Sequence, residues 1–417
     1  MDDGSNWPEG HPEVVVDLDA IAANAAALVA HVRGAQVMAV VKSDGYGHGM
    51  VPTAGAAIAG GASWLGVVQI ADALALRAAG ITVPVLCLLG APDARHGEAV
   101  AADIDLTAGT VAVVEQIAAA ARRAGRRARL HLEADTGMSR CGATAADWPG
   151  LVAAALDAEA AGDVVVVGLW SHFACADMPG HPSIAAQLAA FDAAVGLAER
   201  AGARPQVRHL ANTPATLTLP DAWHDLVRPG GGIVGLSTLP GGAPDWLTPA
   251  MTVRARLVQV KQVAAGTAVS YGHRYTTPGP ATLGVVPLGY NEGIPRLATN
   301  AGPVSVGGRR FTVAGTVNMN QTILDLGDLP AQAGDEVILF GPGTGGEPTA
   351  QEWADALGTI SYEIVTRFTG QVPRRYRGGT SAQGQAADQT AADQTAADQT
   401  AEDQAGGRSN GQVAAAH

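Results

Sequence analysis

Short apolar runs alternate with Ala-rich stretches from about residue 13 to residue 238. This alternation of β-type runs and helical stretches is typical of a parallel sheet covered by helices. The runs predict eight strands, the number that closes a (β/α)8 barrel. We expect the strands at Gln36–Val41, Trp64–Val68, Val83–Leu88, Ile104–Leu106, Ala128–Glu133, Val164–Trp170, Gln206–Leu210 and His224–Val227.

The segment before the first of these strands carries the signals of a helix. Apolar residues recur at helical spacing between Ile21 and Val32. Asp19 is a candidate N-cap, and Gly34 suits the C-terminal cap.

The pattern changes after about Pro240 to β-rich segments separated by Gly and Pro turns. The expected elements are strands at Met251–Val260, Ala281–Val286, Phe311–Val317 and Glu336–Phe340, and a helix near Thr349–Leu357. The sequence therefore predicts a barrel domain at 13–238 and a smaller, mainly β domain at 239–378. Residues 379–417 repeat Ala-Ala-Asp-Gln-Thr and hold no cluster able to form a core, which predicts a disordered tail.

Composition and charge limit the classes of partner and compartment. The formal net charge is -13, which argues against nucleic acid or an anionic membrane as a partner. Cys87, Cys141 and Cys175 have no paired spacing, so neither a disulfide framework nor a thiolate metal site is indicated. The acidic N-terminus lacks the apolar core of a signal peptide, and no apolar run has the length that a bilayer requires. We therefore expect a cytoplasmic protein.

Polar residues stand where the predicted barrel strands end, which is where barrel enzymes carry their chemistry. They are Lys42, Glu133 and Arg140, His172, Asn212 and Thr213, and Arg228 with the following Gly230 and Gly231. The apolar run before Lys42 desolvates it, and desolvation favours the neutral amine that Schiff-base chemistry needs. A lone strand-end lysine usually just reaches back to water. Here a Gly-rich segment follows it, suited to approach an anionic ligand closely.

The string VKSDGYGHG, which contains Lys42, resembles the pyridoxal 5'-phosphate (PLP) attachment motif of alanine racemases. Further matching strings follow in the family's order across residues 13–378. They are DTGMSRCG at 135–142, WSHFA at 170–174, HLANTP at 209–214, VRPG at 227–230, VSYG at 269–272, PLGY at 287–290, NMNQT at 318–322 and SYE at 361–363. The resemblance implies a TIM-barrel domain that binds PLP, a β-rich C-terminal domain, and racemisation of L- and D-alanine.

The resemblance also implies two catalytic bases. Lys42 would carry PLP as a Schiff base and act on one face of the substrate Cα, and Tyr271 of a partner subunit would act on the other. Two groups are needed because a proton removed from one face must be returned to the opposite face. The implied active form is a homodimer with shared active sites.

Contacts to the cofactor and the substrate follow from the same resemblance. Phosphate contacts would come from Tyr46, Thr213, the backbone N–H groups of Gly230 and Gly231, and Tyr362. Around the ring, the implied residues are Arg228 at the pyridine nitrogen, Arg140 near the phenolic oxygen, His172, and Asn212. Tyr290 and the backbone of Met319 would border the substrate, together with Arg140.

Some positions depart from the family pattern. Glu133 stands where relatives commonly have a carbamylated lysine, and we expect its own negative charge to serve Arg140 instead. The other departures are Thr316, Asn320, Asn291 with Glu292, and Gly231 with Gly232. They leave the choice of substrate open.

Three alternatives remain at this stage. The first is a racemase for serine or another amino acid. The second is a PLP-dependent decarboxylase of the same barrel family, although such enzymes carry a Cys-Asp type pair in the second domain and the three cysteines here lie in the barrel. The third is a non-catalytic PLP-binding barrel, although such proteins usually lack a second domain.

Overall fold

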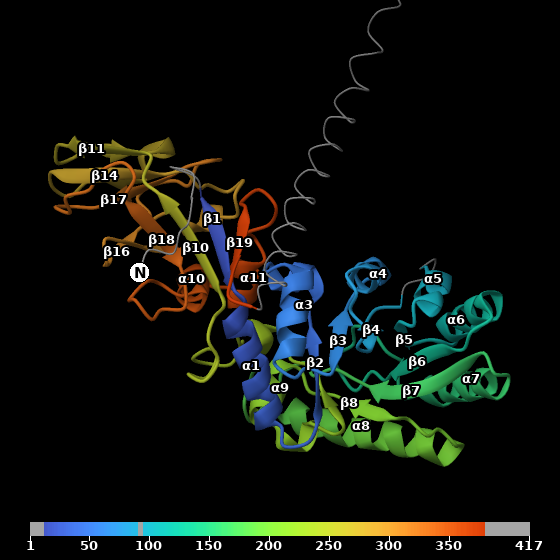
Figure 1. Ribbon diagram of the computed structural model, residues 1–417. Helices are drawn as coiled ribbons and strands as arrows, with labels where there is room; N and C mark the ends of the chain where they lie inside the picture. Colours follow the sequence, from blue (N-terminus) through green and yellow to red (C-terminus); the bar gives the residue numbers. More distant parts are fainter. Residues whose placement is uncertain (1–11, 91–94, 380–417) are drawn as a thin grey trace, which may run out of the picture. The chain divides into compact units, whose positions relative to one another are not determined.

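The computed structural model describes residues 12–90 and 95–379 (Figure 1). Within these ranges the chain divides into two compact units. The first contains Ala20–Ala250 and Ile360–Thr366; the second contains the residues up to Asp19, Met251–Thr359 and the residues from Arg367 onward. The tail from residue 380 lies outside the described ranges, so its predicted disorder stays a prediction.

The first unit is built on eight parallel strands. They are β2 (Gln36–Val40), β3 (Trp64–Val67), β4 (Val85–Cys87), β5 (Asp105–Ala108), β6 (Ala128–Glu133), β7 (Val164–Trp170), β8 (Val207–His209) and β9 (Leu226–Val227). The order is β8-β7-β6-β5-β4-β3-β2-β9. The two ends of this order, β8 and β9, are linked by two backbone hydrogen bonds. They run from Asp225 N to Arg208 O (3.1 Å) and from Arg228 N to Ala211 O (2.9 Å). The predicted barrel is confirmed, and the strand ends differ from the prediction by at most two residues.

Helices cover the outside of these strands (Figure 1). They are α3 (Met50–Ala59), α4 (Ile70–Ala78), α5 (His96–Ala101), α6 (Val111–Ala124), α7 (Trp148–Ala160), α8 (Pro182–Ala201) and α9 (Thr213–Thr218). Helix α1 (Leu18–His31) begins two residues earlier than expected, so Asp19 lies in its first turn and is not the N-cap. It also ends at His31, before Gly34. No helix in the described ranges is long and apolar enough to cross a membrane.

The interior of the barrel is packed with apolar side chains from most of its strands. The buried cluster contains Met38, Val40, Trp64, Leu86, Val167, Val207 and Leu226. Burying a side chain of this size contributes about 1.5–3 kcal/mol. The strand sequences are therefore continuous apolar runs, because the barrel core covers one face of each strand and the helices cover the other.

The second unit contains three sheets. The largest has the order β16-β15-β18-β10-β1-β19, and the others are β11-β14-β17 and β12-β13. Their strands are β1 (Glu13–Asp17), β10 (Met251–Arg256), β11 (Gln259–Val263), β12 (Ala268–Val269), β13 (Tyr275–Thr276), β14 (Ala281–Val286), β15 (Pro303–Val306), β16 (Arg309–Thr312), β17 (Thr322–Asp325), β18 (Glu336–Phe340) and β19 (Arg374–Arg377). Helix α10 (Ala350–Leu357) begins at a capping box of Thr349 and Glu352.

Three features of this unit differ from the expected elements. The segment expected as one strand over Met251–Val260 contains all of β10 and the first residues of β11, and the two strands belong to different sheets because β10 pairs with β18 whereas β11 pairs with β14. The strand expected at Phe311–Val317 ends at Thr312 as β16, and Val313 makes only a single bridge to Leu324. Strand β1 pairs with β10 and β19, so the first described strand belongs to this unit and not to the barrel.

Candidate active site

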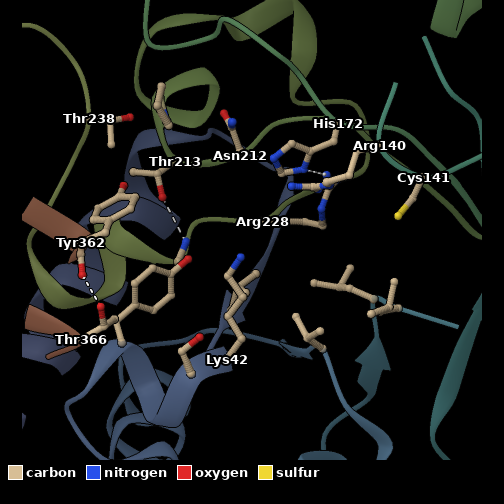
Figure 2. Close-up of a pocket in the computed structure, with 18 of the residues that line it drawn as sticks. Lys42, Arg140, Cys141, His172, Asn212, Thr213, Arg228, Thr238, Tyr362 and Thr366 are labelled. Atoms are coloured by element: carbon tan, nitrogen blue, oxygen red, sulfur yellow. Dashed lines mark hydrogen bonds between the residues drawn. The ribbon is translucent and has the colours of Figure 1, made fainter. Parts of the chain in front are cut away.

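A pocket of about 790 Å³ opens at the carboxyl ends of the barrel strands (Figure 2). The residues that line it and were expected at the site are Lys42, Tyr46, Glu133, Arg140, His172, Asn212, Thr213, Arg228, Gly230 and Tyr362. Tyr362 comes from α11 (Ser361–Val365), within the short segment that returns to this unit. Gly231 does not line the pocket, but it lies against Tyr362.

Lys42 stands at the start of a left-handed turn. It begins α2 (Lys42–Tyr46), and the four residues from Ser43 to Tyr46 have φ between 53° and 62°. Such backbone costs about 1–2 kcal/mol per non-glycine residue and persists where the surroundings enforce it. Here a side chain at Gly45 would collide with Thr53. Burial, and second the charge of Arg140, lower the pKa of the Lys42 amine. The amine points into the pocket.

Arg228 is almost fully buried, with 4% of its surface exposed. Its Nη2 donates to Ser171 O (2.7 Å) and contacts His172 Nδ1 (3.3 Å), as Figure 2 shows for the second of these contacts. The guanidinium also lies 4.9 Å from the ring centroid of Trp170. The pKa of Arg228 is lowered to about 9, chiefly by burial; the charge of Glu133 opposes this shift and that of Arg140 adds to it. The group is still a cation at neutral pH.

His172 is neutral. Burial, followed by the charges of Arg228, Arg140 and Lys42, holds its pKa well below the usual range. Because Arg228 can only donate, Nδ1 of His172 is the acceptor and its hydrogen is on Nε2.

Hydroxyl groups and glycine backbone meet on the other side of the pocket. Thr213 Oγ1 accepts hydrogen bonds from the N–H groups of Gly230 (3.0 Å) and Gly232 (3.3 Å), so the hydroxyl is left to donate its own hydrogen. A Cβ atom at Gly230 would lie 2.2 Å from the hydroxyl oxygen of Tyr46, and one at Gly231 would lie 2.2 Å from that of Tyr362. Only glycine fits beneath these two phenols.

The two phenols complete a cluster of donors. Their rings pack edge to face with centroids 5.4 Å apart, and burial raises the pKa of both. The buried hydroxyl of Tyr362 has no hydrogen-bond partner within residues 12–90 and 95–379. Nearby, Asn212 Oδ1 caps α9 by accepting from Ala215 N (3.2 Å). Several uncommitted O–H donors in one place suit a bound anion.

The ionisation of Glu133 differs from the fixed negative charge that the sequence suggested. Burial raises its pKa to about 7, although the charges of Arg228 and Arg140 oppose this shift. In the part of the chain that the structure describes, no ion pair joins Glu133 to Arg140 within 4 Å. The carboxyl group therefore titrates near neutral pH and is not a fixed anion.

The remaining expected residues lie together in the second unit. Tyr271, Tyr290 and Met319 line a pocket of about 670 Å³ with Arg296, Thr316, Val317 and Asn318. Tyr271 is 72% exposed. Its backbone is nevertheless fixed, because Thr316 Oγ1 donates to its carbonyl (2.7 Å) and Ser270 Oγ donates to Thr316 O (2.6 Å). Ser270 has φ 61° and ψ -175°, a strained conformation for a residue with a side chain.

Sequence reasoning missed the residues that support Arg228 from inside the barrel. His209 Nδ1 lies 3.0 Å from Arg228 Nη1, and Trp170 stacks on His209. His209 and His131 both lie within strands, whereas the site residues were expected just after strand ends. A histidine within an apolar strand, as at His131 and His209, was the available signal.

A (β/α)8 barrel that gathers a lysine of lowered pKa, a buried arginine and an anion cradle at one mouth defines a class of enzyme. Such an enzyme can hold a phosphorylated carbonyl compound through the lysine. The sequence matches the families described as alanine racemase, N-terminal domain, over residues 16–238 and alanine racemase, C-terminal domain, over residues 250–376. The chain belongs to the alanine racemase family, which confirms the resemblance.

Individual relatives agree with this assignment. The alanine racemase of Frankia casuarinae is 57% identical over 365 residues, which cover 87% of this chain and 95% of that protein. The crystal structure of the alanine racemase from D-cycloserine producing Streptomyces lavendulae is 49% identical, with a TM-score of 0.88, and the match covers 91% of this chain and all of that one. The alanine racemase from Streptomyces coelicolor is 53% identical, with a TM-score of 0.87, covering 88% and 98%.

Proposed function

We propose that this chain is a PLP-dependent isomerase that interconverts L- and D-alanine. The observation that carries the proposal is the placement of Lys42, with its lowered pKa, in one pocket with the donors of Tyr46, Thr213 and Tyr362. Alanine as substrate is supported by alanine racemases at up to 57% identity that align over nearly their whole length.

The residues of the barrel pocket fit PLP. A phosphate group needs several donors and little side-chain volume, and the hydroxyls of Tyr46, Thr213 and Tyr362 and the backbone at Gly230 and Gly231 offer both. The unpartnered hydroxyl of Tyr362 is a buried donor that such a phosphate would satisfy.

The other side of the pocket fits the ring of the cofactor. The amine of Lys42 would attach its carbonyl carbon. Arg228 would face the pyridine nitrogen, Arg140 the phenolic oxygen, and His172 and Asn212 would border the ring. When bound, PLP withdraws electrons from the substrate Cα and so makes the Cα proton acidic. Arg228 can donate a hydrogen bond to the ring nitrogen without giving up its proton, which limits that withdrawal.

Two bases in different units would move the proton. Lys42 Nζ, whose pKa is lowered by burial, would exchange a proton at one face of the Cα, and the Tyr271 hydroxyl of the partner subunit would do so at the other. Tyr290 and the backbone of Met319, which share the pocket of Tyr271, would border the substrate with Arg140.

Glu133 would take the place of the carbamylated lysine. A carboxyl group whose pKa is about 7 becomes an anion when a nearby positive charge increases, so we propose that Glu133 orients Arg140 in its ionised form. The gap between the two side chains leaves space for a bridging water.

We infer a cytoplasmic homodimer in which each barrel pocket is completed by the second unit of the partner subunit. The 72% exposure of Tyr271 supports this, because a proton-transferring group needs a covering environment that its own unit does not supply.

Co-expression of two inactive subunits tests the shared site. A Lys42→Ala subunit paired with a Tyr271→Phe subunit forms one doubly altered site and one intact site. We expect about half of the wild-type activity per dimer. Heterodimers that form but stay as inactive as either parent would overturn the arrangement.

A racemisation assay of the purified protein with a panel of amino acids tests the function itself. We expect the highest kcat/KM with alanine in both directions, and loss of activity in Lys42→Ala. Preference for serine would favour the alternative racemase and would direct attention to Thr316, which lines the pocket of Tyr271. Release of carbon dioxide without racemisation would favour the decarboxylase.

A further inference from the structure

A continuous chain of hydrogen bonds runs through the barrel interior from Arg228. Its Nη1 contacts His209 Nδ1 (3.0 Å), His209 Nε2 contacts His131 Nδ1 (2.9 Å), and His131 Nε2 contacts Asp105 Oδ2 (3.0 Å). Arg129 closes the chain by donating to Asp105 Oδ1 (2.6 Å). His209, His131 and Asp105 are each 0% exposed. The hydrogen-bond chain therefore starts at Arg228, just after β9, and runs through β8, β6 and β5, and its members from His209 to Asp105 have no contact with solvent.

The direction of every bond in this chain is fixed by its first member. A guanidinium has only donors, so His209 Nδ1 must accept and the hydrogen of its neutral ring is on Nε2. His131 Nδ1 must then accept, which places its hydrogen on Nε2, facing Asp105. Burial and the charge of Arg228 hold the pKa of His209 well below its usual range, which keeps that ring neutral.

The far end of the chain is an anion. Burial opposes ionisation of Asp105, but the hydrogen bonds from His131 and Arg129 outweigh it and lower the pKa of the carboxyl group. Asp105 is thus a carboxylate that accepts from both neighbours. Groups linked in this way polarise one another, so its charge strengthens His209 as an acceptor for Arg228.

The barrel makes room for these rings at a cost in apolar packing. A Cβ atom at Gly168 in β7 would lie 2.1 Å from His131 Nδ1, so only glycine permits the ring to stand there. The register of β6 against β7 shifts between Leu130 and His131 at the same place. Trp170 stacks on His209 at 5.8 Å with an interplanar angle of 7°. Buried polar groups are costly unless they are fully paired, and an apolar core would avoid that cost.

We propose that His209, His131 and Asp105 are positioning residues that hold Arg228 in one orientation as a donor and supply its charge with a distant counter-ion. This inference rests on the proposed function, because its consequence is the way in which Arg228 meets the ring nitrogen of PLP. None of the three residues touches the pocket, so they act through Arg228 alone.

The direction of the hydrogen bonds can be measured without any reaction of the cofactor. In ¹⁵N spectra of the full-length protein, both histidines should show the neutral Nε2–H form, with signals assigned from His131→Gln and His209→Gln. A neutral Nδ1–H form or a protonated ring at either position would overturn the proposal. If wild-type protein bound no PLP, the proposed function would fail while this measurement would still decide the direction.

The effect on the site is measured with a charge-removing variant and a matched control. Asp105→Asn keeps the shape and removes the anion. Asp163→Asn is the control, because Asp163 directly precedes β7, is 8% exposed and pairs with Arg122, but has no link to Arg228. We expect Asp105→Asn to weaken PLP binding about tenfold, the value of one hydrogen bond to a charged group, and to shift the visible band of bound PLP.

The control variant should leave both the affinity and the band unchanged. A rescue variant separates positioning from packing. His131→Gln retains one acceptor and one donor on the same side chain and should keep the wild-type band, whereas His131→Leu should resemble Asp105→Asn. Equal affinity and band position in folded Asp105→Asn and Asp163→Asn would show that the chain only stabilises the barrel. If His131→Leu does not fold, the two aspartate variants still decide the question.

Discussion

The two pockets of this molecule place their polar residues in opposite ways. In the barrel, Lys42 is half-buried and Arg228 is almost fully buried, and burial shifts the pKa of each. In the second unit, the side chain of Tyr271 is mostly exposed while its backbone is held by Thr316. The difference indicates that the proposed base Lys42 has its properties set within its own unit. The proposed base Tyr271 is only oriented by its unit and depends on whatever covers it.

Removal of the buried amine tests the first half of this comparison and has the largest expected effect. Lys42→Ala should lower racemisation at least about a thousandfold, as loss of a covalently acting residue does. The chain's other lysine, Lys261 in the exposed strand β11, gives the control, and Lys261→Ala should keep wild-type activity. Borohydride reduction followed by mass spectrometry should place PLP on Lys42. Label on Lys261 would contradict the assignment.

Loss of the exposed hydroxyl should give a smaller and unequal effect. Tyr271→Phe should lower racemisation by about a hundredfold or more, the usual contribution of an acid–base group. Exchange of the Cα proton in deuterated water should fall far more for one enantiomer than for the other. Tyr275→Phe is the matched control, because its hydroxyl donates to Asp325 (2.8 Å) and lines neither pocket. Equal losses for both enantiomers in Tyr271→Phe would argue against a two-base mechanism.

Glu133 offers a test of how burial sets charge in the barrel pocket. Its pKa is about 7 in the folded protein and near 4.5 when exposed, so folding disfavours the ionised form. The stability that it contributes is present at low pH and is lost as pH rises towards and through 7. Glu133→Gln removes this loss. In the absence of PLP, the variant should therefore have the same free energy of unfolding as wild type near pH 4 and a higher one at pH 8.

The size of that gain follows from the shift in pKa and is at most about 3 kcal/mol. Urea unfolding at the two pH values measures it. The same variant should have lower racemase activity, because Arg140 loses its neighbouring anion. A variant that is no more stable at pH 8 than wild type would show that Glu133 is already ionised at little cost.

The smallest expected effect tests whether the second unit only aims its tyrosine. Thr316→Val keeps the side-chain shape and removes the hydrogen bond to the Tyr271 carbonyl. Racemisation should fall about tenfold or less, the value of one neutral hydrogen bond, with the same inequality between enantiomers as in Tyr271→Phe. Thr316→Ser should restore the activity. An equal effect on both enantiomers would indicate that Thr316 stabilises the fold in general and does not orient Tyr271 in particular.

Much of the barrel could be read from the sequence because its strands are buried on both faces and form short apolar runs. The strand ends then located Lys42 and Arg228. The left-handed turn after Lys42 could not be read in this way, because three of its four residues are not glycine and an apolar pattern carries no signal of positive φ. The pairing of β1 with β10 was also hidden, since the two strands are more than 230 residues apart in the chain.

Charge was harder to predict than position. Glu133 was located correctly at the end of its strand, but its ionisation depends on how deeply the fold buries it. His131 lies between two leucines, and the apolar run predicted the strand while hiding a polar side chain that is buried inside the barrel. The assignment of individual roles to the site residues, and the boundary expected between residues 238 and 239, stay predictions.

The return of Ile360–Thr366 to the barrel unit has a consequence for biosynthesis. A ribosome completes the eight strands of the barrel by residue 227, well before it reaches Tyr362. Until then the space above Gly231 lacks the phenol that the finished protein places there. A nascent or truncated chain that ends before Tyr362 therefore lacks one of the hydroxyl donors of the proposed anion cradle.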